Sequence, residues 1–217
     1  MTPGPQATQD HVAADAAHAA SATAVTIWSP LLIPPPMQIP DYARAVTGDG
    51  MATPEAPGTH VTGIVERCTP ALVGSGLTTE VFVGAAALLD TVDNDETMLR
   101  QVRFLSDVAA ITPAVCVRVV PAAVGPHPGL RGAFTLFAMN DGTSVARIET
   151  YGATIHLVDD HAFCQGAVTK LGAVALSLEE SANFIDTCVA ERRGRVKDHA
   201  QHDICAPDRA WTELGST

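Results

Sequence analysis

The sequence has few aromatic residues and few basic residues, and both shortages narrow what the protein can be. Only 5% of its 217 residues are aromatic although 47% are hydrophobic, so its core must be built from Ala, Val, Leu and Ile. It has 13 Lys and Arg residues against 24 Asp and Glu residues, which gives a formal net charge of −11. Because nonspecific DNA affinity depends on cations that neutralise phosphates, we expect no direct nucleic-acid binding.

Targeting and redox signals are missing as well. No basic segment followed by an apolar stretch opens the chain, and no apolar run reaches the roughly 20 residues of a membrane helix. The five cysteines form no C-x-x-C pair, and the spacing of His and Cys fits no zinc pattern. We therefore expect a soluble cytoplasmic protein with reduced thiols, no membrane association, no metal and no cofactor.

One stretch organises the rest of the chain: residues 28–46, WSPLLIPPPMQIPDYARAV. Each of the consecutive prolines 34–36 fixes its own φ and removes an amide donor, which predicts a stiff extended arm and not a strand inside a sheet. Asp41 can then cap a helix that carries Tyr42. An apolar arm needs a groove to lie in, and Tyr42 is a candidate ligand contact in that groove.

The composition divides the chain into three parts. Residues 1–25 have almost no large apolar side chain, so they cannot offset their ordering entropy and are predicted to be a disordered tail. Residues 26–193 form a single domain, and residues 194–217 form a polar tail. Hydrophobic periodicity predicts helices at 60–72, 93–107, 159–175 and 177–193, and strands at 81–83, 114–121, 133–139, 144–149 and 154–158. This order predicts an α+β fold, a small mostly antiparallel sheet packed with helices and preceded by the proline-rich extended arm.

Three local signals support these boundaries. The Asp-Gly pair at 141–142 is typical of a tight turn between two antiparallel strands. Asp93 or Asn94 can cap the helix that follows, because its first turn has free backbone amides. Ser177 and Glu180 have the spacing of a capping box, in which each side chain accepts a hydrogen bond from the other residue's amide.

Several stretches together resemble one family. They are LLIPPPMQIPDYARAV, QVRFLSDVAA, VRVVPAAVGPHPGLRGAFTLFAM, RIET and ALSLEESANFI, in this order between residues 28 and 193. The chain resembles the C-terminal domain of unknown function in actinobacterial antitoxin-like helix-turn-helix regulators, which are often encoded beside a small partner protein. The resemblance implies the effector half of a regulator.

The chain departs from this family in two respects. Members have an N-terminal helix-turn-helix before the arm, whereas only about 25 low-complexity residues precede it here, without a basic face. The family usually has an Arg-Gln pair where this chain has Arg67 and Cys68, and a glutamate where it has Ala85. A changed site and neutral drift both explain such losses, and both alternatives stay open.

The main polar cluster contains the candidate catalytic residues. Arg147, Glu149 and Tyr151 alternate along one predicted strand and therefore share a face, and His156 lies on the next strand. A carboxylate near an imidazole suits general acid–base catalysis, which makes Glu149 and His156 the candidate catalytic pair. Arg147 and Tyr151 are candidate ligand-binding residues. The same pattern is also typical of an exposed sheet edge with no catalytic role.

A glycine-rich loop at residues 125–132 supplies two further candidates. His127 and Arg131 can close over a pocket from this loop, and an arginine there can bind a carboxylate or a phosphate. The alternative is an ordinary solvated loop.

Two classes of function follow from these observations, with a third in which no ligand binds. The first is a domain that senses a small molecule or binds a small partner protein, with the DNA-binding half absent. The second is a cofactor-independent secondary-metabolism enzyme, a cyclase or isomerase, because held geometry and proton transfer suffice for ring closure or imine chemistry. An enclosed cavity with convergent ionisable groups would favour the enzyme, and an open apolar patch would favour partner binding. A homodimer with crossed arms is compatible with the sequence.

Overall fold

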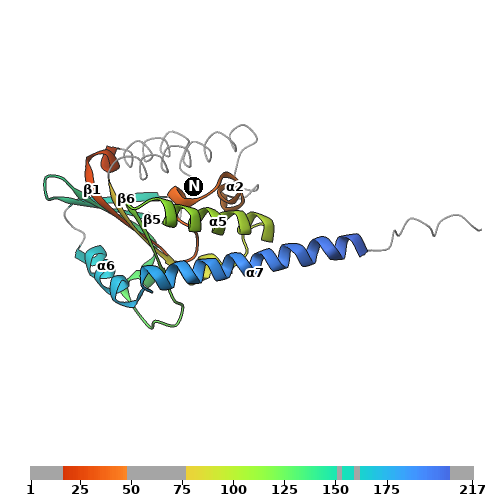
Figure 1. Ribbon diagram of the computed structural model, residues 1–217. Helices are drawn as coiled ribbons and strands as arrows, with labels where there is room; N and C mark the ends of the chain where they lie inside the picture. The colour runs from red at the N-terminus through yellow and green to blue at the C-terminus, as the bar shows by residue number, and fades with distance from the viewer. Residues whose placement is uncertain (1–16, 48–76, 151–152, 159–161, 206–217) are drawn as a thin grey trace, which may run out of the picture.

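The computed structural model describes residues 17–47, 77–150, 153–158 and 162–205, which form a sheet with helices on both faces (Figure 1). The six strands lie in the order β3-β2-β1-β4-β5-β6. Their bounds are β1 Ala22–Ser29, β2 Thr78–Gly84, β3 Val115–Val120, β4 Phe134–Met139, β5 Ser144–Thr150 and β6 Ala153–Val158. The helices are α2 Pro40–Thr47, α4 Ala85–Leu89, α5 Asp95–Ile111, α6 Ala162–Val174 and α7 Leu178–Cys205, with 3-10 turns η1 Pro35–Met37 and η2 Pro128–Arg131.

The sheet is mixed, with β1 near its middle. β1 pairs in parallel with β2, and β2 pairs in parallel with β3. The other three pairs, β1 with β4, β4 with β5 and β5 with β6, are antiparallel. The expected α+β fold with a mostly antiparallel sheet is therefore confirmed. The helix expected at 60–72 lies outside the described residues.

Each face of the sheet has its own core. On one face, α5 and α7 pack against the strands, and the buried side chains include Val25, Val81, Val117, Leu105 and Ile185. On the other face, α6 contributes Leu171 to a core that it forms with Trp28, Phe82, Phe134 and Ala146 of the strands. Figure 1 shows α7 running below α5 and continuing past the sheet. Small and β-branched side chains supply most of the first core, as the shortage of aromatic residues predicts. The second core departs from this prediction, because Trp28, Phe82 and Phe134 gather there.

Strand β1 lies partly in the segment predicted to be a disordered tail. It begins at Ala22, and residues 17–21 before it are helical. The start of this strand was not predicted because Ala22 and Ala24 have low β-propensity, although the Thr, Val and Ile residues of the strand favour it. Between β2 and β4, however, both edges of β1 are hydrogen-bonded, and the sheet decides the conformation.

The proline-rich stretch is an extended arm in part only. Trp28 and Ser29 complete the central strand β1, which corrects the prediction that the arm begins there. The segment then forms the turn η1, in which the Met37 amide donates to the Pro34 carbonyl oxygen at 2.8 Å. A proline φ near −65° suits a 3-10 turn as well as an extended chain, so the prolines alone do not decide between them. Ile33 and Met37 are fully buried.

Side chains hold this segment against the domain. The Ile33 amide donates to the Tyr42 hydroxyl oxygen at 3.1 Å, and the Gln38 side-chain amide donates to the Ile33 carbonyl oxygen at 2.6 Å. Tyr42 is fully buried, and this burial raises the pKa of its hydroxyl group. The segment is thus fixed by hydrogen bonds that replace those of a regular sheet ladder.

The three local signals in the sequence are confirmed. Asn94 caps α5 by accepting from the Thr97 amide at 2.9 Å. The Ser177 amide donates to the Glu180 carboxylate at 2.8 Å and the Glu180 amide donates to the Ser177 hydroxyl at 3.2 Å, which completes the capping box of α7. The β4–β5 turn places Gly142 at a positive φ of 86°. Both helices begin, and the hairpin turns, where the local chemistry predicts. Helix α7, however, continues to Cys205, past the predicted end at residue 193 and into the segment predicted to be a polar tail.

Candidate functional site

The predicted polar cluster lies on the half of the sheet formed by β4, β5 and β6. Arg147 on β5 pairs with Thr135 on β4 and with His156 on β6, so the three residues form one row across the sheet. Arg147 is half-buried and lines a hollow of about 40 Å³ beside Pro34–Pro36. A space of this size holds about one water molecule.

A second histidine joins this row. The His18 ring lies 5.2 Å from the His156 ring and 5.7 Å from the Phe137 ring, measured between centroids. The backbone of Glu149 pairs with Thr154, and Tyr151 lies outside the described residues. Within the described part of the chain, no group of three or more His, Cys, Asp or Glu side chains is placed to hold a metal.

The glycine-rich loop packs on the opposite face of the sheet. The His127 ring meets the Trp28 ring edge-on at 5.8 Å, and the Trp28 indole donates to the Gly129 carbonyl oxygen at 2.8 Å. A Cβ at Gly129 would lie 2.9 Å from both His127 Nδ1 and Trp28 Nε1, so a side chain there would have to displace these rings. The Arg131 guanidinium lies 4.7 Å from the ring centroid of Phe163 on α6. The loop is thus closely packed against Trp28 and α6.

The predicted site residues are therefore divided among three places. Arg147 and His156 lie together on one face of the sheet. His127 and Arg131 lie on the other face, around η2. Tyr42 is buried in the main core beneath residues 30–39. The structure does not bring these five side chains to one cavity.

A polar hollow of about 530 Å³ lies between α2 and the start of α5. Its charged groups neutralise one another, because Asp41 forms ion pairs with both Arg44 and Arg100. Such exposed pairs are ordinary features of a solvated surface.

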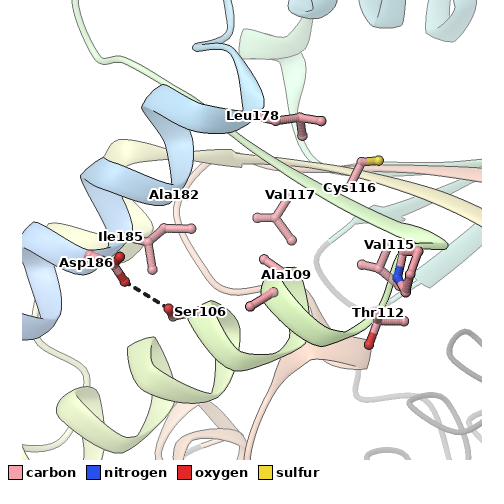
Figure 2. A pocket seen from close by; sticks show the side chains of 12 residues that line it. Ser106, Ala109, Thr112, Val115, Cys116, Val117, Leu178, Ala182, Ile185 and Asp186 are labelled. Atoms are coloured by element: carbon pink, nitrogen blue, oxygen red, sulfur yellow. Dashed lines mark hydrogen bonds between the residues drawn. The ribbon is translucent and has the colours of Figure 1, made fainter.

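A largely apolar hollow of about 340 Å³ lies at the other edge of the sheet, between the end of α5, strand β3 and the start of α7. Figure 2 shows Val117 pointing between the two helices, with Ala109 on α5 and Ala182 and Ile185 on α7 around it. Ser106, Ala110, Thr112, Pro113, Val115, Cys116, Leu178 and Asp186 complete its lining.

The hollow exists because small residues meet where two helices diverge. Alanines at 109, 110 and 182 leave space that larger side chains would fill. The Ser106 hydroxyl donates to the Asp186 carboxylate at 2.9 Å, which links α5 to α7 at one side of the space. The apolar lining is partly open to solvent, since Leu178 is 54% exposed.

Backbone groups of β3 also face this region. The Thr79 amide on β2 donates to the Ala114 carbonyl oxygen, so residues 114, 116 and 118 direct their backbone groups to β2. Val115, Val117 and Val119 consequently direct theirs outward. The Val119 amide donates to the Ser181 hydroxyl at 3.0 Å, and its carbonyl oxygen accepts from the Leu176 amide at 2.9 Å.

The hollow was not predicted from the sequence, because the candidate sites were chosen for their ionisable residues. The only ionisable side chains in its lining are Asp186 and Cys116. One signal was present: the strand at 114–121 and the start of the last helix were both predicted. The sequence does not show that the edge of β3 lies near the short side chains at 109 and 182. Their proximity follows only from the parallel pairing of β2 with β3.

The fold and the hollow define a domain with one mixed sheet, two cores and an apolar depression at a sheet edge. Residues 12–187 match the family model described as Domain of unknown function (DUF5753), and the chain belongs to this family. No curated protein and no solved structure matches the chain. Among the described residues, none of the helices combines the length and apolarity needed to cross a membrane.

Proposed function

We propose that this chain is a protein-interaction domain that resembles the effector half of a transcriptional regulator. The observation that carries the proposal is the apolar hollow of about 340 Å³ beside the outer edge of β3. Leu178 in its lining is 54% exposed, so apolar surface of the hollow is open to solvent. Exposed apolar patches of this kind are typical of interaction sites.

The geometry gives less support to the two other functions, small-molecule sensing and catalysis. A small-molecule site usually has several convergent polar groups in an enclosed cavity, whereas this lining is mostly Ala, Val, Leu and Ile. A cyclase or isomerase acting through His156 would need room for a substrate beside it. The hollow that Arg147 lines is about 40 Å³, which is too small for such a molecule.

The charge of the chain favours a protein partner over a nucleic acid. Its formal net charge of −11 opposes phosphate backbones. A small partner protein, as the family resemblance implies, fits an apolar surface on an acidic domain. We therefore place the binding surface at the α5–β3–α7 hollow and assign no catalytic role to Glu149 or His156.

A displayed library of genomic protein fragments, selected on the purified full chain, would test this proposal. Selected fragments should bind the wild-type chain and bind Ala182→Glu at least about tenfold more weakly, because a carboxylate would enter the apolar space. Ala190→Glu is the matched control, since Ala190 is exposed on the same helix outside the hollow. His156→Ala should also bind normally. Fragments that bind Ala182→Glu as tightly as wild type, or a selection that yields none, would contradict the proposal.

A further inference from the structure

Strand β6 forms the edge of the sheet at the end opposite β3, and within the described part of the chain it pairs with β5 alone. Its sequence, ATIHLV, has no charged residue and no proline, and its register with β5 is continuous. Soluble proteins usually protect an edge with charges, prolines or bulges, because unpaired backbone groups are a template for another strand. This edge is accessible, since Ile155 is 44% exposed and Val158 is 61% exposed.

The hydrogen bonds of the neighbouring strands show which residues of β6 direct their backbone groups outward. The Met139 amide donates to the Thr143 carbonyl oxygen, so the even-numbered residues of β5 direct their backbone groups to β6. Their partners in β6 are Ile155 and Leu157, whose backbone groups therefore face β5. The residues whose backbone groups point away from the sheet are Thr154, His156 and Val158.

We propose that β6 pairs with β6 of a second copy of this chain, antiparallel and around a two-fold axis at His156, so that the two sheets become one. With the axis at this position, Thr154 lies opposite Val158 of the partner subunit, and the outward backbone groups of the two strands match. For Thr154 and Val158, no hydrogen-bond partner of these outward groups is found among the described residues. The inference goes beyond the proposed function, because it uses the other edge of the sheet and leaves the α5–β3–α7 hollow open.

The side chains of β6 suit a second copy of the same strand. In this register Ile155 lies opposite Leu157 of the partner subunit, on the face of the sheet that carries Ala146 and the α6 core. On the other face, Thr154 lies opposite Val158 of the partner subunit. Cross-strand pairs of apolar and β-branched side chains stabilise a sheet, and pairing removes the exposed Ile155 and Val158 from water.

The charges of the strand also favour a second copy over a charged segment of another protein. β6 has no Lys, Arg, Asp or Glu, so two copies bring no such charges together, and a charged foreign strand would find no ionic partner on it. A two-fold axis uses each matching pair of residues twice. The net charge of −11 on each chain opposes association, and salt screens this repulsion.

Sedimentation equilibrium of the full chain tests the dimer. The wild-type chain should show a monomer–dimer equilibrium that added salt strengthens. Val158→Lys places a charge on the edge and should weaken the dimer at least about tenfold. Ile111→Lys is the matched control, because Ile111 is 77% exposed at the end of α5 and lies outside β6. Both lysines make the chain less acidic, so a general charge effect would strengthen both dimers, and only edge pairing predicts a selective loss.

Amide hydrogen exchange followed by NMR tests the backbone contacts without a substitution. The Thr154 and Val158 amides become hydrogen-bonded in the dimer, so their exchange should slow at least about tenfold when the chain concentration rises from well below to well above the dissociation constant of the dimer. The Ile155 and Leu157 amides face β5 and should exchange slowly at both concentrations.

Three results would overturn the proposal. The first is a wild-type chain that stays monomeric, and the second is a dimer that tolerates Val158→Lys or forms without slowing exchange at Thr154 and Val158. The third is a monomer in which selected fragments of other proteins slow exchange at these two residues, which would assign the edge to a foreign strand. The proposed function fails separately, through fragments that bind Ala182→Glu as tightly as wild type, because Ala182 lines the hollow at the other edge.

Discussion

The side chain of Gln101 on α5 binds the backbone on both sides of Gln38, because its amide nitrogen donates to the Met37 carbonyl oxygen at 2.7 Å while its oxygen accepts from the Ile39 amide at 2.8 Å. Gln101 is fully buried and so is Met37. One side chain thus supplies the two hydrogen bonds that the chain would otherwise make in a sheet. These hydrogen bonds lie between α5 and residues 30–39, where a backbone group without a partner would reduce the stability of the fold.

We predict that Gln101→Leu destabilises the fold by about 2–4 kcal/mol, because it leaves a buried carbonyl and a buried amide without partners. Urea denaturation followed by circular dichroism measures the change. Gln165→Leu on α6 is the control, since Gln165 is exposed and should change stability by no more than about 0.5 kcal/mol. Equal stability of the two variants would show that the bonds of Gln101 contribute nothing net.

Arg192 on α7 should be the most sensitive charged residue. Its guanidinium is 1% exposed and donates to the carbonyl oxygens of Leu88, Leu89 and Asp90 at 2.7–2.9 Å and to the Asp95 carboxylate at 3.1 Å. Arg192→Met removes the donor from the three carbonyl oxygens, although Asp95 keeps its ion pair with Arg195, and we expect a loss of about 3–5 kcal/mol.

The control for this prediction is the next residue. Arg193 is exposed, so Arg193→Met should change the free energy of unfolding by about 0.5 kcal/mol or less. Arg192→Lys should rescue only part of the loss, because an ammonium group does not reach three carbonyls and a carboxylate as a planar fork does. Full rescue by lysine would refute the geometric argument and leave only the charge.

Gly84, between β2 and α4, should tolerate no side chain. A Cβ at this position would overlap the Pro30 carbonyl oxygen, although the φ of −67° is ordinary for any residue. The penalty therefore comes from the close approach of two backbone segments, and Gly84→Ala should destabilise the domain by about 1–3 kcal/mol.

A glycine-to-alanine change at Gly194 should have the opposite effect on the stability of the chain. A Cβ at Gly194 within α7 meets nothing within 4 Å, so Gly194→Ala should stabilise the chain by about 0.5–1 kcal/mol through helix propensity. The thermal midpoints of the two variants should move in opposite directions. If both rise, the contact with Pro30 is not restrictive.

The capping box of α7 predicts a pH dependence. Hydrogen bonds from Ser177 hold the pKa of the Glu180 carboxyl below its usual range. A depressed folded-state pKa stabilises the fold above the unfolded-state pKa, and this contribution is lost as pH falls through the folded-state value. Wild type should therefore exceed Glu180→Gln in stability at pH 7, and the difference should vanish in acid below the usual glutamate range.

The measurement is the midpoint of urea denaturation for both chains between pH 7 and pH 2.5 or so, a range that spans carboxyl titration. Glu179→Gln, one position earlier in the same first turn, is the control for a general effect of helix charge. A difference between wild type and Glu180→Gln that stays constant with pH would contradict an ionised capping carboxylate.

Much of the local structure followed from the sequence because its causes are local. The Asp-Gly pair at 141–142 specifies a tight turn, and Ser177 with Glu180 specifies a helix start. The apolar stripe of Met98, Val102 and Leu105 specifies which face of α5 is buried. Each of these signals acts within about one turn of the chain, so the printed residues suffice to predict it.

The candidate site was predicted less well, for a reason that concerns strand pairing. Arg147 and His156 were correctly expected on neighbouring strands, and the β5–β6 pairing places them in register. His127 was expected to close over a pocket, but its ring packs against Trp28, on the face of the sheet opposite Arg147 and His156. The face that a loop covers depends on strand order, which hydrophobic periodicity does not specify.

The sequence alone therefore determined the α+β class, the helix caps and the acidic charge, because these depend on composition and on neighbours a few residues apart. Tertiary structure decided that residues 22–29 form a central strand, that the prolines turn over a buried Met37, and that β3 forms an edge beside a hollow. These features come from contacts between segments as far apart as Gln101 and Met37. A backbone group that is buried without a partner reduces the stability of the fold, so burial requires each of these hydrogen bonds. Only the assembled domain provides that burial.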